Sequence, residues 1–155
     1  MMNHLTGSLL RAGAVALLAV LVVGGNVVGQ SPILQELGVE DVVFASRQPG
    51  GGGHWYENFG YYAHDEHEKL YRAKGRLCRL NVATGQVTIL LQDDEGSIRD
   101  PQVHYDGQRI LFSYRPGGTD YFHLCEISTD GNGLRQLTSG PYDDMEPTYL
   151  PNGQI

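Results

Sequence analysis

The stretch that decides the fold is "DPQVHYDGQRILFSYRPGG", residues 100 to 118, because its opening pattern returns at residues 146 to 155 as "EPTYLPNGQI". Both segments begin with an acidic residue and a proline, and both contain a D-G or N-G pair followed by glutamine. The matching positions are separated by a constant offset of 46 residues. Self-similarity at a fixed period of this size indicates a repeat architecture.

Two further alignments extend the repeat. "GRLCRLNVATGQVTIL" (75–90) matches "FHLCEISTDGNGLRQL" (122–137) at an offset of 47, and the two cysteines coincide. "VVFASRQPGG" (42–51) matches "ILFSYRPGG" (110–118) at an offset of 68, and a phenylalanine and an arginine coincide. The first copy of the repeat therefore carries an insertion, which lies at residues 50–75.

Each repeat predicts four short strands. The Asp106-Gly107 pair predicts a tight hairpin, because glycine tolerates the positive φ that such turns require. The glycine-rich stretches "RPGGTD" and "TDGNG" mark the next two connections. A repeated four-stranded unit of this length is typical of a propeller blade. In the complete copy we expect the strands Pro101 to Tyr105, Arg109 to Tyr114, Tyr121 to Ser128 and Gly133 to Thr138.

The predicted fold class is all-β: a partial β-propeller of about two four-stranded blades and the start of a third. Blade one has no recognisable inner strand before Val42, and propellers typically close with 4 to 8 blades. We therefore expect an N-terminal part of a longer protein, with the missing strand beyond Ile155. The expected division is a signal peptide (1–29), a linker (30–41), blade one (42–91), blade two (100–138) and the start of blade three (146–155).

The first 29 residues are typical of a secretory signal peptide. Arg11 precedes an apolar run from about Ala12 to Val23, and small residues follow, with cleavage expected after Gly29. The alternative is a retained membrane anchor, but the run is shorter than the ~20 residues that a spanning helix needs. No cysteine follows it for lipid attachment. We expect a periplasmic or extracellular protein without stable membrane insertion.

The segments "DPQVHYDGQRILFSYR" and "GLRQLTSGPYDDMEPTYLPNGQI" resemble the TolB-type, WD40-like (PD40) propeller repeat. A narrower resemblance, carried by "GGHWYENFGYY", "RLCRLNVATG" and "GPYDDMEPTYLPNG", is to hydrazine synthase alpha-subunit-like exported proteins. That family implies a propeller within a larger polypeptide that also carries c-type haem domains. No CxxCH motif occurs here, so haem attachment would have to be encoded downstream, and no cofactor is expected in these residues.

The charge excludes one class of partner. The chain has 11 Lys and Arg against 18 Asp and Glu, and removal of the signal peptide moves its net charge from −7 to −8. Nucleic-acid binding requires clustered positive charge, which is absent from the sequence. A cationic or protein partner fits better.

Acidic residues concentrate in the expected loops between blades, at 92–100 and 139–146. Such a rim would attract basic proteins or a divalent cation such as Ca²⁺, which prefers carboxylate oxygens. The simpler alternative is a solvated surface. The rim residues are Asp93, Asp94, Glu95, Asp143, Asp144 and Glu146, beside Asp65, Glu66 and Glu68 of the insertion.

The insertion carries two further candidate features. His64 and His67 are spaced to share a helix face, and with His54 they could bind Zn²⁺, against the alternative of a polar loop. A dense aromatic group would either plug the propeller mouth or contact a partner. The group is Trp55, Tyr56, Phe59, Tyr61 and Tyr62.

The only two cysteines, Cys78 and Cys125, fall on equivalent strands of different blades, so we expect two free thiols. The sequence contains no nucleophile elbow and no phosphate-binding glycine loop. The leading hypothesis is a non-catalytic scaffold that binds a protein partner or a downstream domain. The alternatives are the propeller of a multihaem redox enzyme and that of a prolyl-oligopeptidase-type peptidase.

Overall fold

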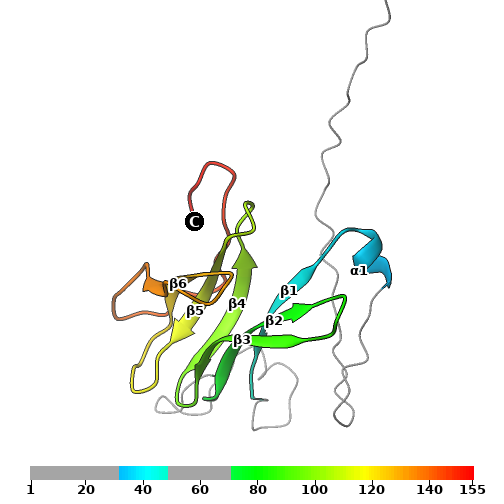
Figure 1. The fold of residues 1–155 in the computed structure, drawn as a ribbon. Coiled ribbons are helices and arrows are strands. Elements are labelled where there is room, and N and C mark those ends of the chain that lie inside the picture. The colour runs from blue at the N-terminus through cyan, green and yellow to red at the C-terminus, as the bar shows by residue number, and fades with distance from the viewer. Residues whose placement is uncertain (1–31, 49–70) are drawn as a thin grey trace, which may run out of the picture.

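The computed structural model describes residues 32–48 and 71–155, which form two antiparallel sheets and one short helix (Figure 1). The predicted all-β class is confirmed, and no helix lies between residues 100 and 155. The residues expected to form a signal peptide and most of the insertion lie outside the described residues. In the part of the chain that is described, no helix is long and apolar enough to span a membrane.

The two sheets follow each other along the chain. Sheet A has the strand order β1-β2-β3, and sheet B has the order β4-β5-β6-β7. The helix α1 (Pro32–Glu36) precedes them, inside the segment expected to be a linker. The strands of sheet A are β1 (Asp41–Ser46), β2 (Gly75–Asn81) and β3 (Val87–Asp93). Those of sheet B are β4 (Ser97–Val103), β5 (Arg109–Arg115), β6 (His123–Ser128) and β7 (Arg135–Gln136).

The strand register is the same in both sheets. Phe44 of β1 pairs with Cys78 of β2, and Phe112 of β5 pairs with Cys125 of β6. Residues that the sequence offsets of 68 and 47 relate therefore occupy equivalent positions in the two sheets, so that β1 corresponds to β5 and β2 to β6. The agreement extends to both ends of the strands, where Asp41–Asn81 corresponds to Arg109–Ser128 and Ser46–Arg76 to Tyr114–His123.

The 46-residue offset also repeats an unusual backbone conformation. Asp100 has a φ of 53° and Glu146 a φ of 56°, and each precedes a proline. Residues other than glycine rarely adopt the left-handed region. Its recurrence at this spacing indicates that residues 100 and 146 occupy equivalent positions.

The turn that follows is repeated as well. Gly107 and Gly153 have φ values of 72° and 85°, as the D-G and N-G pairs predict. The amides of these glycines donate to the carbonyls of His104 and Leu150, at 2.9 and 3.0 Å. In both turns the backbone amide of the residue after glycine donates to the side chain of the residue before glycine. Gln108 donates to Asp106 at 2.9 Å, and Gln154 donates to Asn152 at 3.2 Å.

Strand β4 corrects the expectation that Pro101 opens the inner strand. The strand begins at Ser97, and Pro101 lies within it, where the pairing register shifts between Arg99 and Gln102. Proline has no N–H to donate to the ladder, so a strand accommodates it at such an irregularity. The loop expected at 92–100 shrinks accordingly to Asp94–Gly96.

Other strand boundaries also differ from expectation. Strand β6 begins at His123 rather than Tyr121, and the outer strand β7 contains only Arg135 and Gln136. The strand expected from Pro147 is not formed, because among the described residues no neighbouring strand pairs with it. Its burial still alternates, with Pro147 and Tyr149 buried and Thr148 and Leu150 exposed. This period of two is typical of an extended strand with one covered face.

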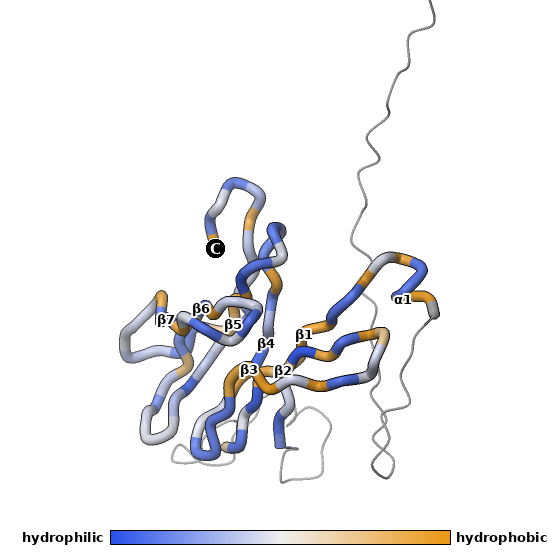
Figure 2. Tube along the Cα trace, viewed as in Figure 1, coloured by the Kyte–Doolittle hydropathy of each residue, from blue (hydrophilic) through white to orange (hydrophobic). Residues whose placement is uncertain are grey.

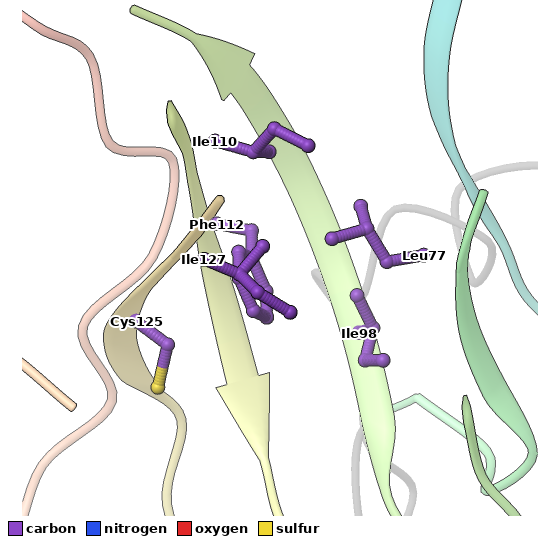
Figure 3. Close-up of a cluster of buried hydrophobic side chains, with 6 residues drawn as sticks. All are labelled: Leu77, Ile98, Ile110, Phe112, Cys125 and Ile127. Atoms are coloured by element: carbon purple, nitrogen blue, oxygen red, sulfur yellow. The ribbon is translucent and has the colours of Figure 1, made fainter. Parts of the chain in front are cut away.

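The core lies where the two sheets face each other (Figure 3). Leu77 of sheet A packs against one face of sheet B, and the partly buried Val43, Ala45, Leu90 and Leu91 add to the sheet A side. The hydrophobic stretches run along the strands, whereas most of the turns between them are hydrophilic (Figure 2). The buried residues of sheet B in this core are Ile98, Ile110, Phe112, Cys125 and Ile127.

Gly75 allows the two sheets to approach at the start of β2 and β4. Its amide donates to the Gly96 carbonyl at 3.0 Å, and a Cβ at this position would lie 2.5 Å from the Ile98 nitrogen. We expect Gly75→Ala to cost ~1–3 kcal/mol, because backbone must move to relieve the clash. Urea unfolding would measure this. The exposed neighbour Arg76→Ala serves as the control, and equal stability of the two variants would contradict the close approach.

Candidate interaction site

The face of sheet B that points away from sheet A is polar although it is buried. Paired residues share a face of a sheet, and Ser97 pairs with Arg115 while Arg99 pairs with Ser113. Because side chains alternate along β5, Ser113 and Arg115 lie on one face of the sheet and Phe112 lies on the other. This surface is called the polar face below. Among the described residues, it carries every buried polar or charged side chain: Ser97, Arg99, Ser113, Arg115 and Glu126.

Two arginines form the first part of the polar face. Arg99 is 4% exposed, binds the adjacent Asp100 carboxylate, and places its guanidinium 4.0 Å from the centre of the Tyr71 ring. Arg115 donates to the Tyr71 carbonyl at 2.7 Å and lies 4.9 Å from the Phe122 ring. Burial lowers the pKa of Arg115, and Asp143 and Asp120 oppose that shift. Rings and carboxylates together thus stabilise the two buried cations.

Glu126 forms the second part. It accepts hydrogen bonds from Arg135 Nη2 at 2.7 Å, from the Tyr149 hydroxyl at 2.8 Å, and from Arg109 Nη1 at 3.4 Å. Burial alone would raise the pKa of Glu126, but the hydrogen bonds from Tyr149 and Arg135 outweigh burial and lower it. Burial and the same hydrogen bond raise the pKa of Tyr149. The carboxylate is therefore a charged acceptor with its partners in place.

Residues 143–149, called the docking segment below, cover the polar face. At one end, the Asp143 carboxylate accepts from the Phe122 amide at 2.8 Å, and the Asp144 amide donates to the Phe122 carbonyl at 2.8 Å. At the other end Tyr149 reaches Glu126. Between these ends, Arg99 contacts the Met145 sulfur and the Glu146 carboxylate, each at 3.5 Å. The segment is thus held at both ends and in the middle by sheet B and by Phe122, the residue that precedes β6.

The same face of sheet A also receives the part of the chain that follows it. Val43, Ala45 and Leu77 correspond by register to Leu111, Ser113 and Leu124 of sheet B. On sheet A this face packs against β4 and its neighbours. On sheet B it packs against the docking segment, which lies 46 residues after β4 and shares with it the acidic residue followed by proline. Successive units therefore stack with one polarity.

The structure gives the predicted rim residue Asp93 a local role. Its carboxylate accepts hydrogen bonds from the amides of Glu95, Gly96 and Gly117 at 2.8–2.9 Å and from the Tyr114 hydroxyl at 2.7 Å. Burial alone would raise the pKa of Asp93, but these bonds lower it to about 2. Asp93 thus joins the β3–β4 turn to the turn after β5.

The other rim residues have separate partners. Asp94 accepts from the Gln92 amide group at 3.0 Å, and the Asp144 carboxylate lies 3.3 Å from His123 Nδ1. Asp143 and Glu146 belong to the docking segment, and Glu95 is exposed. In residues 32–48 and 71–155, no group of three or more His, Cys, Asp or Glu side chains could hold a metal ion. Cation binding by the rim stays a prediction.

The remaining predicted site residues lie in the insertion, outside the described residues: His54, His64, His67, Trp55, Tyr56, Phe59, Tyr61 and Tyr62. Sequence reasoning missed the polar face itself. One signal was available in the sequence. Glu126 lies within a predicted strand and Arg99 lies just before one, and each is next to an apolar residue, as alternation along a strand requires. Cys78 and Cys125 are free and buried, as expected.

No family model matches the chain, and no curated protein matches it. A solved structure with similarity is the Kuenenia stuttgartiensis hydrazine synthase, at 21% sequence identity and a TM-score of 0.49. The match covers 64% of this chain and 12% of that protein's chain.

Proposed function

We propose that this chain is part of a TolB-type propeller scaffold in an exported protein, and that it functions by binding extended protein segments. The observation that supports this role is the stacking of successive units with one polarity. The face that receives β4 on sheet A and the docking segment on sheet B is the same face by register. Stacking of strand units through a repeated interface is typical of repeat proteins.

The chemistry of the polar face favours a particular kind of segment. Arg99 and Arg115 are buried cations, and Glu126 is a buried acceptor for a phenol hydroxyl. A segment with carboxylates at one end and a tyrosine about five residues later satisfies both, as "DDMEPTY" (143–149) does. A partner protein or another domain would present the same pattern.

A competition experiment with the full chain tests this proposal. The double variant Met145→Ala, Tyr149→Ala removes two contacts between the docking segment and the polar face. Release of the segment would be measured as faster hydrogen exchange of the Phe122 amide, whose acceptor is Asp143. A synthetic peptide of residues 141–155 should then bind this variant more tightly than it binds the wild type, whose polar face is already covered.

A peptide with Tyr149→Phe provides the matched control. It lacks only the hydroxyl whose hydrogen bond Glu126 accepts, and it should bind about 10- to 150-fold more weakly, because a hydrogen bond to a charged group contributes ~1.5–3 kcal/mol. If the Phe122 amide exchanges faster in the double variant but no peptide binds, the polar face is not a docking surface.

A further inference from the structure

The turns of this chain contain pairs in which asparagine or aspartate directly precedes glycine. In such a pair the backbone nitrogen of glycine can attack the side-chain carbonyl carbon of the preceding residue, because glycine has no side chain to hinder the approach. A nitrogen whose N–H is held in a hydrogen bond is restrained from this attack. The pairs are Asp106–Gly107, Asp130–Gly131, Asn132–Gly133 and Asn152–Gly153.

Three of the four glycine amides are held in this way. Each donates to the carbonyl three residues earlier, Gly107 and Gly131 at 2.9 Å and Gly153 at 3.0 Å. The Gly133 amide differs, because none of the residues that the structure describes accepts a hydrogen bond from it. The hydrogen bonds therefore single out Asn132–Gly133 as the pair whose glycine nitrogen is unrestrained.

The surroundings of this pair are open. Asn132 and Gly133 are both exposed, in the turn between β6 and β7. Gly133 has a φ of 69°, and a Cβ placed on it would meet no heavy atom within 4 Å outside its chain neighbours. Neither packing nor a hydrogen bond thus opposes movement of the Gly133 nitrogen toward the Asn132 side chain, and water reaches both residues.

We infer that Asn132 is a site of spontaneous covalent modification, which converts its side-chain amide to a carboxylate. The Gly133 nitrogen forms a bond to Asn132 Cγ, the bond between Cγ and Nδ2 breaks, and ammonia leaves with the proton that the Gly133 nitrogen loses. Water then opens the resulting succinimide ring on one of two sides. Opening at Cγ gives aspartate, and opening at the main-chain carbonyl carbon gives isoaspartate. The only co-reactant is water, and nothing is oxidised or reduced.

The turn that carries Asn132 also contacts sheet A. Arg79 of β2 donates to the Thr129 carbonyl at 3.1 Å. A Cβ placed on Gly131 would lie 3.2 Å from the carbonyl oxygen of Leu90 in β3, so the main chains of the turn and of sheet A approach closely. A change in the shape of this turn therefore affects the contact between the two sheets.

Isoaspartate would change that shape. The Asn132 carbonyl accepts from the Ser128 amide at 2.9 Å, and the Asn132 amide donates to the Asp130 carboxylate at 3.0 Å. Both products place a second negative charge beside Asp130. Isoaspartate also adds a methylene to the main chain between these two hydrogen-bonding groups. We expect isoaspartate to loosen the turn and its contact with sheet A.

Peptide mapping of the full chain locates the modification. Trypsin does not cut between Arg115 and Pro116, so its peptide of residues 110–135 contains Asn132 as its only side-chain amide. After incubation of the folded protein at mildly alkaline pH in water labelled with heavy oxygen, this peptide should gain the mass expected when NH2 is replaced by labelled OH. An isoaspartate methyltransferase should then methylate it.

Hydrogen exchange tests the effect on the turn. The Thr129 amide donates to the Gln108 carbonyl at 3.0 Å, which makes its exchange rate a measure of the closed turn. Exchange should be faster in the isoaspartate form, separated by ion exchange, than in Asn132→Asp, which carries the new charge without the extra methylene. Equal exchange in the two forms would contradict the expected loosening.

Asp106→Asn provides the matched control for the reaction. It creates the same pair of residue types in a turn whose glycine amide is held. In the folded chain position 106 should react roughly five- to tenfold more slowly than Asn132, because the hydrogen bond of Gly107 has to open first. In urea, where neither turn is formed, the two rates should converge.

Three results would overturn the inference. The first is no uptake of heavy oxygen at Asn132 in the folded chain, and the second is reaction at position 106 of Asp106→Asn that is as fast as at Asn132. The third is a difference between the two positions that persists unchanged in urea, because the flanking sequence rather than the free Gly133 amide would then determine the rate.

Discussion

Replacing Phe112 with alanine is expected to lower the free energy of unfolding by about 3–5 kcal/mol, because the change leaves a cavity in the core between the sheets. Phe112 is 0% exposed and lies among Leu77, Ile98 and Ile127, at the centre of the buried cluster. Urea denaturation of the full chain, analysed for both midpoint and slope, would measure the loss.

Two other aromatic positions provide controls for this prediction. Tyr142→Ala removes a ring that is 77% exposed and should change stability by less than about 0.5 kcal/mol. Phe44→Ala, at the equivalent position of sheet A, should show an intermediate loss, because its side chain is only partly buried. Equal losses at residues 44 and 112 would contradict the different surroundings of the two sheets.

The second large effect is expected at Asp93. Asp93→Asn should cost roughly 2–3 kcal/mol near pH 6, because an amide nitrogen in place of Oδ2 leaves the Gly117 amide without its acceptor. The Asp94→Asn variant makes the same chemical change at an exposed residue whose partner is the Gln92 side chain, and it should be close to neutral.

The pH dependence of stability provides an independent check on Asp93. Its pKa is about 2 in the folded protein, below the ordinary 3.8, so its contribution is present above pH 3.8 and is lost as the pH falls toward 2. The difference in unfolding free energy between wild type and Asp93→Asn should therefore shrink across this range. A constant difference from pH 5 to pH 2 would show that the carboxylate charge is not responsible.

The repeat was predictable because it depends on local signals. The D-G and N-G turns, the prolines and the coincident cysteines mark equivalent positions, and the strand register follows them. The start of β4 was not predictable in the same way. Proline at residue 101 suggests a strand beginning, and only the pairing of Ser97 with Arg115 reveals that the strand extends four residues further back.

The polar face was missed for a related reason. Arg99 and Glu126 are charged residues that alternate with apolar ones along their strands, a pattern that is equally typical of a strand with one solvent-exposed face, so it does not reveal that they are buried. Their burial depends on Tyr71, Tyr149 and the docking segment, which are distant in sequence from one partner or the other. Contacts of this kind arise from the way that units stack, which a strand pattern does not encode.

Each sheet contains one buried free cysteine, whose reaction with a thiol reagent measures how often that sheet opens. Burial raises the pKa of the Cys78 thiol and raises that of Cys125 to about 11, so neither residue forms an appreciable amount of thiolate at neutral pH while its sheet is closed. A thiol-specific reagent therefore reacts only with molecules whose sheet has transiently opened. Cys78 pairs with Phe44 in sheet A, and Cys125 pairs with Phe112 at the equivalent position of sheet B. Their two labelling rates therefore compare the local opening of sheet A with that of sheet B inside a single molecule.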